Sequence, residues 1–345
     1  MKTNKKMVYV AMSVDLVHPG HLNIINHAKR LGDVTIGLLT DKAISSYKKP
    51  PLMDYKDRYK IVSSLKGVVN VVSQNTLDYE INLKKLKPDF VIHGDDWRKG
   101  PQRNIRKKVI EVLKKWNGRL IEVPYSKGYS SNKINSLLSD IGTTPDIRRK
   151  SLKRMLMVKN CLRFLDIHNG LSGLIIENTK VNVAGKSEEF DGMWGSSLTN
   201  STAKGKPDIE AVDLTERLQL LNEVLEVTTK PIIYDADTGG KSEHFVFTVK
   251  TLERLGVSGV IIEDKIGLKK NSLFKNQSGT KQDKPNLFAK KIKKICDTRQ
   301  SNDFMVIARI ESFIVGKGLQ DALKRAEIYS KAGADAILIH SKEKT

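Results

Sequence analysis

Short apolar runs alternate with amphipathic stretches along the whole chain, which is the pattern of parallel α/β folds. In the first half, strand-like runs cover 7–13, 34–39, 68–72, 90–93 and 120–123. The segments 19–31, 55–65 and 105–115 have helical spacing, and 84–86 ends a further helix. We therefore predict a parallel sheet with helices between its strands in the first half.

The second half continues the alternation with six strand-like runs that lead into polar or charged residues. They cover 164–167, 192–194, 231–235, 259–263, 304–308 and 336–340. In a (β/α)8 barrel, functional residues lie at the carboxyl ends of the strands, and a whole barrel usually takes about 250 residues. Because 151–345 is shorter than that, we expect a (β/α)8-type barrel truncated after its sixth strand. We expect this second half to be a fragment of a barrel, a naturally truncated barrel or a barrel that is closed in another way.

The alternation weakens at 139–150, where SDIGTTPDIRRK is polar and contains Gly142 and Pro145. We expect a linker at 141–150, between a first domain over 1–140 and a second over 151–345.

Composition is compatible with a globular, intracellular chain. Hydrophobic residues make up 39%, and the only cysteines, Cys161 and Cys296, match no metal-binding spacing. The sequence shows no signal peptide and no apolar run of the ~18 residues that a membrane helix needs. We expect a cytoplasmic protein with no membrane partner.

The net charge of +21 is concentrated in the first half, where 29 Lys and Arg stand against 14 Asp and Glu in residues 1–150. This excess suits a polyanion such as a nucleoside triphosphate, or is a lysine-rich solvated surface. The densest basic stretch, 98–108, lacks interleaved aromatic residues. We therefore expect small-molecule substrates and no nucleic acid.

Residues 13–21 read SVDLVHPGH, a strand end and a turn followed by a helix start. A helix N-terminus offers free amides and a positive dipole end to phosphate, and Gly20 removes a side chain where phosphate oxygens would approach. His18 and His21 are then candidates to donate hydrogen bonds to an α-phosphate. By itself, H-x-G-H is equally compatible with two ordinary histidines at a helix start.

This stretch resembles the cytidylyltransferase family, which has an H-x-G-H signature. Arg58 in DYKDRYKI matches the arginine of a second motif, and Gly94, Asp95, Asp96 and Trp97 match a third. Gly128, Ser130 and Ser131 in YSKGYSSNK fit the late phosphate-binding motif, where Tyr125 replaces an arginine and Asn132 a threonine. Lys127 and Lys133 are candidates to restore that charge. Over roughly 7–140, the resemblance implies a Rossmann-like nucleotidyltransferase domain with CTP as substrate.

Other residues near these motifs have less specific roles. Lys48 and Lys49 lie in a loop after the second strand, where they either close on the phosphates or are simply solvated. Asp15 binds Mg2+, orients the histidines or is a turn residue. The expected nucleotide-binding set is Ser13, Asp15, Gly20, Lys48, Arg58, Gly94, Asp95, Asp96, Gly128, Ser130 and Ser131.

The second half places carboxylates after two neighbouring strands. PIIYDADTGG supplies Asp235 and Asp237, and VIIEDK supplies Glu263. Oxygen ligands without soft donors suit Mg2+. We therefore predict a magnesium site formed by these three residues, the alternative being simple solvation.

The segments WGSS, DADTGG, EDKIGLKKNSLF, ARIESF and HS resemble, in this order, phosphoenolpyruvate mutase of the isocitrate lyase superfamily. Carbon–carbon lyases of that superfamily carry a catalytic cysteine where this chain has Asn271 and Ser272, and the related phosphonopyruvate hydrolase tends to lack the asparagine. The resemblance implies that Trp194, Ser196, Ser197 and Leu198 bind substrate, and that Lys269, Asn271, Ser272, Arg309, His340 and Asp208 act in catalysis. Lys269 to Ser272 would form a lid. Asp208 is alternatively a helix N-cap, and Arg309 alternatively only an ion-pair partner of Glu311.

Together, the two resemblances predict a bifunctional enzyme of phosphonate biosynthesis: a mutase joined to a cytidylyltransferase that acts on a phosphonate or phosphate monoester. One alternative is an active nucleotidyltransferase with a non-catalytic scaffold barrel, and another is a phosphonopyruvate hydrolase in the barrel. We expect a homo-oligomer, as in relatives of the superfamily.

Overall fold

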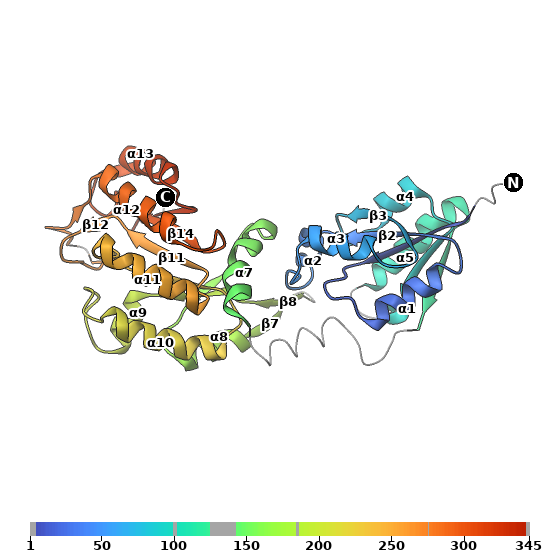
Figure 1. The fold of residues 1–345 in the computed structure, drawn as a ribbon, viewed down its shortest axis with the longest axis horizontal. Helices are drawn as coiled ribbons and strands as arrows, with labels where there is room; N and C mark the ends of the chain where they lie inside the picture. The colour runs from blue at the N-terminus through green and yellow to red at the C-terminus, as the bar shows by residue number, and fades with distance from the viewer. Residues whose placement is uncertain (1–4, 99–101, 125–142, 184–185, 275, 343–345) are drawn as a thin grey trace. The chain divides into compact units, whose positions relative to one another are not determined.

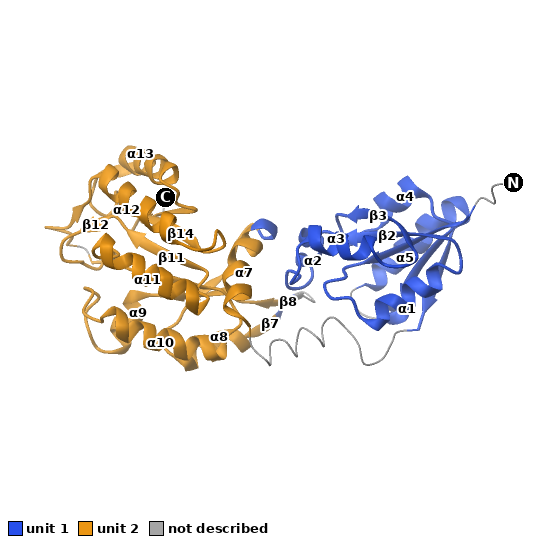
Figure 2. Ribbon diagram, viewed as in Figure 1, with its two compact units in different colours: residues 1–141, 157–159, 182–187 blue, residues 142–156, 160–181, 188–345 orange. Residues whose placement is uncertain are grey.

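The computed structural model describes residues 5–98, 102–124, 143–183, 186–274 and 276–342 (Figure 1). The chain divides into two compact units (Figure 2). Unit 1 comprises 1–141 with the short segments 157–159 and 182–187, and unit 2 comprises 142–156, 160–181 and 188–345. Gly128, Ser130 and Ser131, which we expected to bind nucleotide, lie outside the described residues.

Unit 1 contains a five-stranded parallel sheet with the order β3-β2-β1-β4-β5. The strands are β1 Met7–Met12, β2 Asp33–Leu39, β3 Val68–Gln74, β4 Phe90–Gly94 and β5 Arg119–Val123. The helices are α1 Pro19–Ala28, α2 Asp41–Ser45, α3 Tyr55–Ser63, α4 Glu80–Leu86 and α5 Arg103–Leu113, with short 3-10 turns at Asp95–Arg98 and Lys114–Trp116. The five strands that the apolar runs predicted are all present.

The central strand β1 shows how the sheet divides its core. Val8, Val10 and Met12 pack on one face with residues of α1 and α3, whereas Tyr9 and Ala11 pack on the other with residues of α4 and α5. Successive side chains of a strand point to opposite faces, so an apolar strand needs helices on both sides. The result is a doubly wound α/β unit, in agreement with the predicted class.

Unit 2 contains six parallel strands in the order β15-β14-β11-β10-β9-β6, so each strand lies beside the next one of the sheet along the chain. They are β6 Phe164–Asp166, β9 Gly192–Gly195, β10 Ile232–Asp235, β11 Gly259–Glu263, β14 Met305–Ile310 and β15 Ala336–Ile339. This singly wound, curled order is that of a barrel sheet, and all six strands match the predicted runs.

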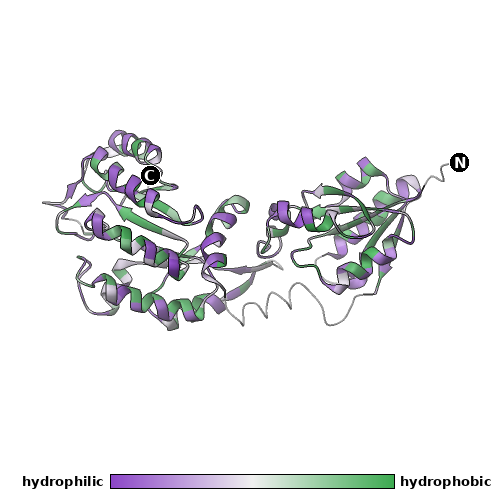
Figure 3. Ribbon diagram, in the orientation of Figure 1, coloured by the Kyte–Doolittle hydropathy of each residue, from purple (hydrophilic) through white to green (hydrophobic). Residues whose placement is uncertain are grey.

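Helices α7 Pro145–Val158, α8 Gly170–Asn178, α9 Ser197–Ala203, α10 Leu214–Val227, α11 Ser242–Leu255, α12 Pro285–Thr298 and α13 Gly318–Lys331 complete unit 2. Two small two-stranded sheets, β7 Lys180–Val183 with β8 Lys186–Glu189 and the antiparallel pair β12 Lys265–Ile266 with β13 Lys281–Gln282, were not predicted. The strands are the more hydrophobic elements, and most helices mix hydrophilic and hydrophobic positions (Figure 3).

The two faces of the unit 2 sheet have different cores. Ile232, Val260 and Val306 pack with buried residues of α10 to α13 in the larger cluster. Ile233 and Ile261 face the other way and pack with Leu152 of α7. Helix α7 begins at Pro145, inside the segment that we expected to be a linker, and its buried Arg148 donates to the carbonyls of Leu225 and Thr228 at the end of α10.

Candidate active sites

A cavity of about 230 Å3 opens in unit 1 at the carboxyl ends of β1 and β4. Six residues of the predicted site line it: Ser13, His18, Gly20, His21, Gly94 and Asp96. The carboxyl ends of neighbouring parallel strands meet at one edge of the sheet, and this explains why motifs from 13–21 and 94–96 come together.

The rings of the two histidines are in contact at the start of α1, with centroids 3.8 Å apart and planes tilted by 31°. The backbone amide of His18, which precedes α1, donates to Nδ1 of His21 at 3.4 Å. Because Nδ1 of His21 accepts, the proton of its neutral ring is on Nε2. Nδ1 of His18 is buried and has no hydrogen-bond partner among the described residues. Both side chains line the cavity, as a phosphate-binding role requires.

Burial is the main influence on the charge of this pair. It lowers the pKa of His18, and burial together with the charges of His18 and Lys48 lowers the pKa of His21 to about 3. Lys48 is partly buried, its ammonium lies 3.4 Å from Oγ of Ser13, and burial lowers its pKa as well. Lys49 is exposed. The site is therefore built around two neutral imidazoles and one nearby lysine.

Arg58 does not line the cavity, although the motif predicted a nucleotide-binding role. Its guanidinium is fully buried, donates 2.5 Å to the carbonyl of Ser13 and 3.2 Å to that of Met53, and pairs with Asp41 at 2.5 Å. It therefore holds the loop after β1 against α2 and α3. Asp15 is also buried away from the cavity lining, where it accepts from the amide of Met53 at 3.2 Å.

The loop between these groups is strained. Val14 has a φ of 44°, in the left-handed region that a β-branched residue rarely adopts. Strain of this kind persists where surrounding contacts over-determine the backbone, as Arg58 does here. The sequence did not identify His93 or Tyr47 as lining residues; His93 stacks on Trp97 with centroids 3.8 Å apart. Asp95 lies beside the cavity but does not line it.

A second cavity, of about 170 Å3, lies in unit 2 at the carboxyl ends of its strands. Apart from Leu273, every lining residue belongs to the predicted set: Trp194, Ser196, Ser197, Leu198, Asp208, Asp235, Lys269, Asn271, Ser272, Arg309 and His340. A singly wound sheet explains the agreement, because each strand end in turn delivers its following loop to the same mouth.

The segment from Lys269 to Ser272 closes over this cavity. Nζ of Lys269 donates to Ser197 at 2.8 Å and to Asp208 at 2.7 Å, and it also pairs with Asp237. Asp208 is not a helix N-cap; it binds the lid instead. Three of the four lid residues, Lys269, Asn271 and Ser272, are buried.

Arg309, His340 and Glu311 form one cluster at the ends of β14 and β15. Oε1 of Glu311 lies 2.5 Å from Nε of Arg309 and 2.9 Å from Nδ1 of His340. Ser272 donates to Oε2 of the same carboxylate at 2.7 Å. Arg309 therefore does pair with Glu311, yet it also lines the cavity. Glu311, which we did not predict as a site residue, orients both side chains.

One of the three carboxylates predicted to bind metal lines the cavity, and the other two do not. Asp235 lines the cavity; Asp237 pairs with Lys269 and, at 3.0 Å, with Arg217 of α10. Glu263 is 1% exposed and lies 2.8 Å from Arg309, but neither of its oxygens has a hydrogen-bond partner among the described residues. In the described ranges, no three acidic, histidine or cysteine side chains converge on one metal position. The metal set remains a prediction.

The charges around these carboxylates act in opposite directions. Burial would raise the pKa of Asp235, but Arg309, Lys269 and Arg217 outweigh it and the net pKa is lowered. Burial, followed by the charge of Asp235, raises the pKa of Asp237 in spite of Lys269 and Arg217. Burial also raises the pKa of Glu263, to about 7, against the opposing charges of Arg309 and Lys265.

A singly wound parallel sheet with a polar, lidded cavity at the carboxyl ends of its strands defines unit 2 as a barrel-type α/β enzyme domain. Comparison with known proteins gives the family. Residues 152–345 match the family model described as phosphoenolpyruvate phosphomutase, which is more than half of the chain, and the protein therefore belongs to that family. Residues 13–136 match the cytidylyltransferase-like model.

Relatives of both parts are known. A phosphoenolpyruvate phosphomutase of Tetrahymena pyriformis is 43% identical over 212 residues, which cover 61% of this chain and 66% of that protein. An ethanolamine-phosphate cytidylyltransferase of Dictyostelium discoideum is 36% identical over 137 residues, 38% of this chain and 37% of that protein. The chain thus spans less than two thirds of the length of either relative.

A solved structure of a phosphonopyruvate hydrolase with oxalate and Mg2+ is also similar. It is 31% identical with a TM-score of 0.50, over 59% of this chain and 65% of that one. Among the residues that the structure describes, no helix has the length and apolar character to cross a membrane.

Proposed function

We propose that the chain is a bifunctional enzyme of phosphonate biosynthesis. Unit 2 interconverts phosphoenolpyruvate and 3-phosphonopyruvate, and unit 1 transfers CMP from CTP to a phosphonate or phosphate monoester. The observation that carries the first part is the closure of Lys269, Asn271 and Ser272 over a cavity that also contains Asp235, Arg309 and His340. Membership of the phosphomutase family supports it.

The mutase reaction needs a phosphoryl group to move within one molecule. The P–O bond of the enol phosphate breaks, a P–C bond forms to C3, and the enolate oxygen becomes the ketone oxygen, so no other reactant is needed. The transition state is loose and metaphosphate-like. Arg309 and His340, both held by Glu311, are placed to stabilise the charge that separates. Ser196 and Ser197 line the cavity where phosphoryl oxygens would bind.

Magnesium fits the donor set on chemical grounds. Asp235, Asp237 and Glu263 supply only carboxylate oxygens, which Mg2+ prefers. Both oxygens of Glu263 are buried and, among the described residues, have charged neighbours in Arg309 and Lys265 but no hydrogen-bond partner. When bound, Mg2+ would orient the substrate and neutralise negative charge. These three residues would hold it, directly or through water.

Exclusion of water decides between a mutase and a hydrolase. A metaphosphate-like species reacts with water unless C3 of the enolate captures it first. Lys269, Asn271 and Ser272 are each less than 7% exposed, and a closed lid of this kind separates the reacting groups from solvent. The presence of Asn271, which the related hydrolase tends to lack, supports the mutase, and this residue lines the cavity.

In unit 1, an acceptor oxygen would form a bond to the α-phosphorus of CTP while the bond to the β-phosphate oxygen breaks and pyrophosphate leaves. The lining histidines at the start of α1 support this role. The acceptor class includes 2-aminoethylphosphonate, phosphocholine and glycerol 3-phosphate. We also propose a cytoplasmic homo-oligomer, which light scattering of the purified chain would test.

Phosphorus NMR tests unit 2. With phosphonopyruvate and Mg2+, the signal of phosphoenolpyruvate should grow, because the enol phosphate is the favoured side of the equilibrium. If inorganic phosphate is the only product, unit 2 is a hydrolase. If nothing changes, it is a non-catalytic scaffold.

Pyrophosphate release tests unit 1. CTP and each acceptor in turn should give release, and ATP should be a poor substitute. If none of the acceptors in the panel gives pyrophosphate release, or if ATP is used better than CTP, the assignment is wrong.

A further inference from the structure

A buried arginine of helix α10, Arg217, contacts the loop that carries the predicted metal-binding aspartates. It is 5% exposed and lies within an otherwise apolar stripe with Leu221 and Val224. A guanidinium in such a position is costly to bury unless its donors are satisfied. The hydrogen-bond acceptors of the Arg217 guanidinium therefore indicate the role of this side chain.

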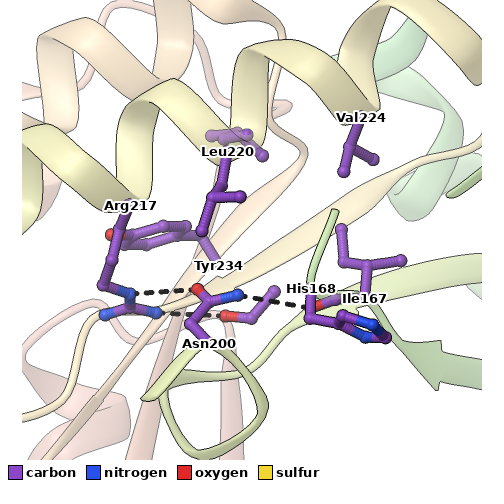
Figure 4. Close-up of a pocket in the computed structure, with 9 residues that line it drawn as sticks. Ile167, His168, Asn200, Arg217, Leu220, Val224 and Tyr234 are labelled. Carbon is purple, nitrogen blue, oxygen red and sulfur yellow. Dashed lines mark hydrogen bonds between the residues drawn. The ribbon is translucent and has the colours of Figure 1, made fainter. Parts of the chain in front are cut away.

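The guanidinium has four acceptors around the end of β10. NH1 donates to Oδ2 of Asp237 at 3.0 Å, and NH2 donates to the carbonyl oxygens of Asp235 at 2.5 Å and Gly195 at 3.3 Å. Nε donates to Oδ1 of Asn200 at 3.3 Å, as Figure 4 shows. One side chain thus joins the ends of β9 and β10 and one of the predicted metal ligands.

Packing holds the guanidinium in place. It lies over the ring of Tyr234, 4.5 Å from the centroid, and Asn200 reaches on to the carbonyl of Ile167 (Figure 4). Beside it is a cavity of only about 10 Å3, which leaves room for about one water molecule. The planar fork of arginine, unlike the ammonium of lysine, can satisfy acceptors in several fixed directions.

The backbone at Asp237 needs such support. Its φ of 55° lies in the left-handed region, which an aspartate adopts at some energetic cost. Arg217 binds Oδ2 of Asp237, while Oδ1 faces Lys269 of the lid. The carboxylate is thereby fixed with one oxygen turned toward the cavity side and the other turned away.

We propose that Arg217 is a positioning residue of unit 2 that fixes the orientation of Asp237 and the end of β10 for binding a divalent cation. The inference rests on the proposed metal site, but it concerns the geometry of the ligands rather than the reaction. The sequence feature that marks Arg217 is its position in α10, four residues before the buried Leu221, which places a charged side chain on the apolar face of the helix.

Arg148 provides a matched control. It is also 5% exposed and lies in unit 2, but within the described part of the chain its acceptors are the backbone carbonyls of Leu225, Thr228 and Leu255. Replacing it should lower stability without changing the metal site. The comparison of Arg217 with Arg148 therefore separates positioning from a structural role.

The experiment measures binding of Mn2+ alone to the full chain by electron paramagnetic resonance, with Asp235→Ala identifying the share of binding that belongs to unit 2. Arg217→Lys and Arg217→Met should both weaken that binding by about 10- to 100-fold, the usual effect of losing a residue that orients a ligand. Arg148→Met should lower the melting temperature and leave Mn2+ affinity unchanged.

Other outcomes overturn the proposal. If Arg217→Met binds Mn2+ more tightly and Arg217→Lys binds it normally, Arg217 only adds repulsive charge. If both variants merely melt earlier, its role is structural. If neither Arg217 variant folds, Asn200→Ala, which removes one acceptor of the guanidinium, should give a smaller loss of Mn2+ affinity. Unchanged Mn2+ affinity in Asn200→Ala would then refute the positioning role. A wild-type chain without Mn2+ binding in unit 2 would instead remove the proposed metal site itself, and this inference with it.

Discussion

Nδ2 of Asn271 donates a 2.8 Å hydrogen bond to Oδ2 of Asp208, and the other oxygen of that carboxylate accepts from Lys269. Asp208 comes from the loop that follows α9, whereas the lid follows β12. A single carboxylate therefore holds two residues of the lid in the closed position. Several properties of unit 2 should depend on this contact.

Replacing Asp208 should open the lid. In Asp208→Ala, Lys269 and Asn271 lose a shared buried acceptor, which destabilises the closed arrangement. Water then competes with C3 for the phosphoryl group, and phosphorus NMR should show a larger share of inorganic phosphate. Asp213→Ala, which removes only the N-cap of α10 at a cost of ~1 kcal/mol, is the control and should keep the product ratio. An unchanged ratio in Asp208→Ala would show that this clamp is not needed.

Asn271 itself should affect the reaction rate and not the metal. Its side chain lies at the cavity and forms hydrogen bonds with Asp208 and with the amide of Leu273, neither of which is a predicted metal ligand. Asn271→Ala should lose most of the mutase rate, on the order of 10² or more, as for a lost transition-state donor. Mn2+ affinity should stay normal, whereas Asp235→Ala should reduce both. Wild-type activity in Asn271→Ala would end the proposed role of the lid.

His18 should be required for cytidylyl transfer. It lines the cavity at the start of α1, with its Nδ1 buried. His18→Ala should reduce turnover by ~10²–10⁴, the range expected for a lost hydrogen-bond or acid–base group. Pyrophosphate release at saturating CTP measures it. The exposed His27 of the same helix gives a control, because His27→Ala should keep full turnover. Equal rates for the two variants would argue against a catalytic His18.

His21 should make the stability of unit 1 depend on pH. Its pKa is lowered to about 3, first by burial and then by His18 and Lys48, whereas an unfolded histidine titrates near 6.5. Between these values the unfolded chain binds more protons than the folded one, so the free energy of unfolding rises with pH. The stabilisation is present above about pH 6.5 and is lost as the pH falls toward 3.

Urea unfolding at a series of pH values tests this. His21→Asn should give a shallower dependence of the unfolding free energy on pH between about 4 and 6.5, and His27→Asn should keep the wild-type slope. A wild-type slope in His21→Asn would mean that the imidazole is not neutral in the folded protein.

The positions of the strands and nearly all residues of the unit 2 cavity follow closely from the sequence, and the reason is local. Short apolar runs such as 232–235 and 259–263 favour buried strands because of their length and the turn residues that bound them, and parallel strands present their carboxyl ends at one edge. Motifs that directly follow strands, such as those at Ser13, Asp235 and Arg309, are therefore brought to the same edge of their sheet once it forms.

Tertiary packing alone decided the roles of charged residues within helices and loops. Arg58 follows a family motif, yet its guanidinium holds the loop at Ser13 and does not reach the cavity. Arg217 looks like a solvent-facing charge in α10, yet it binds Asp237. Long side chains span several ångströms in any direction, so their partners depend on which distant segments pack beside them. A single sequence determines where such a residue lies along a helix, and only the assembled fold determines what it binds.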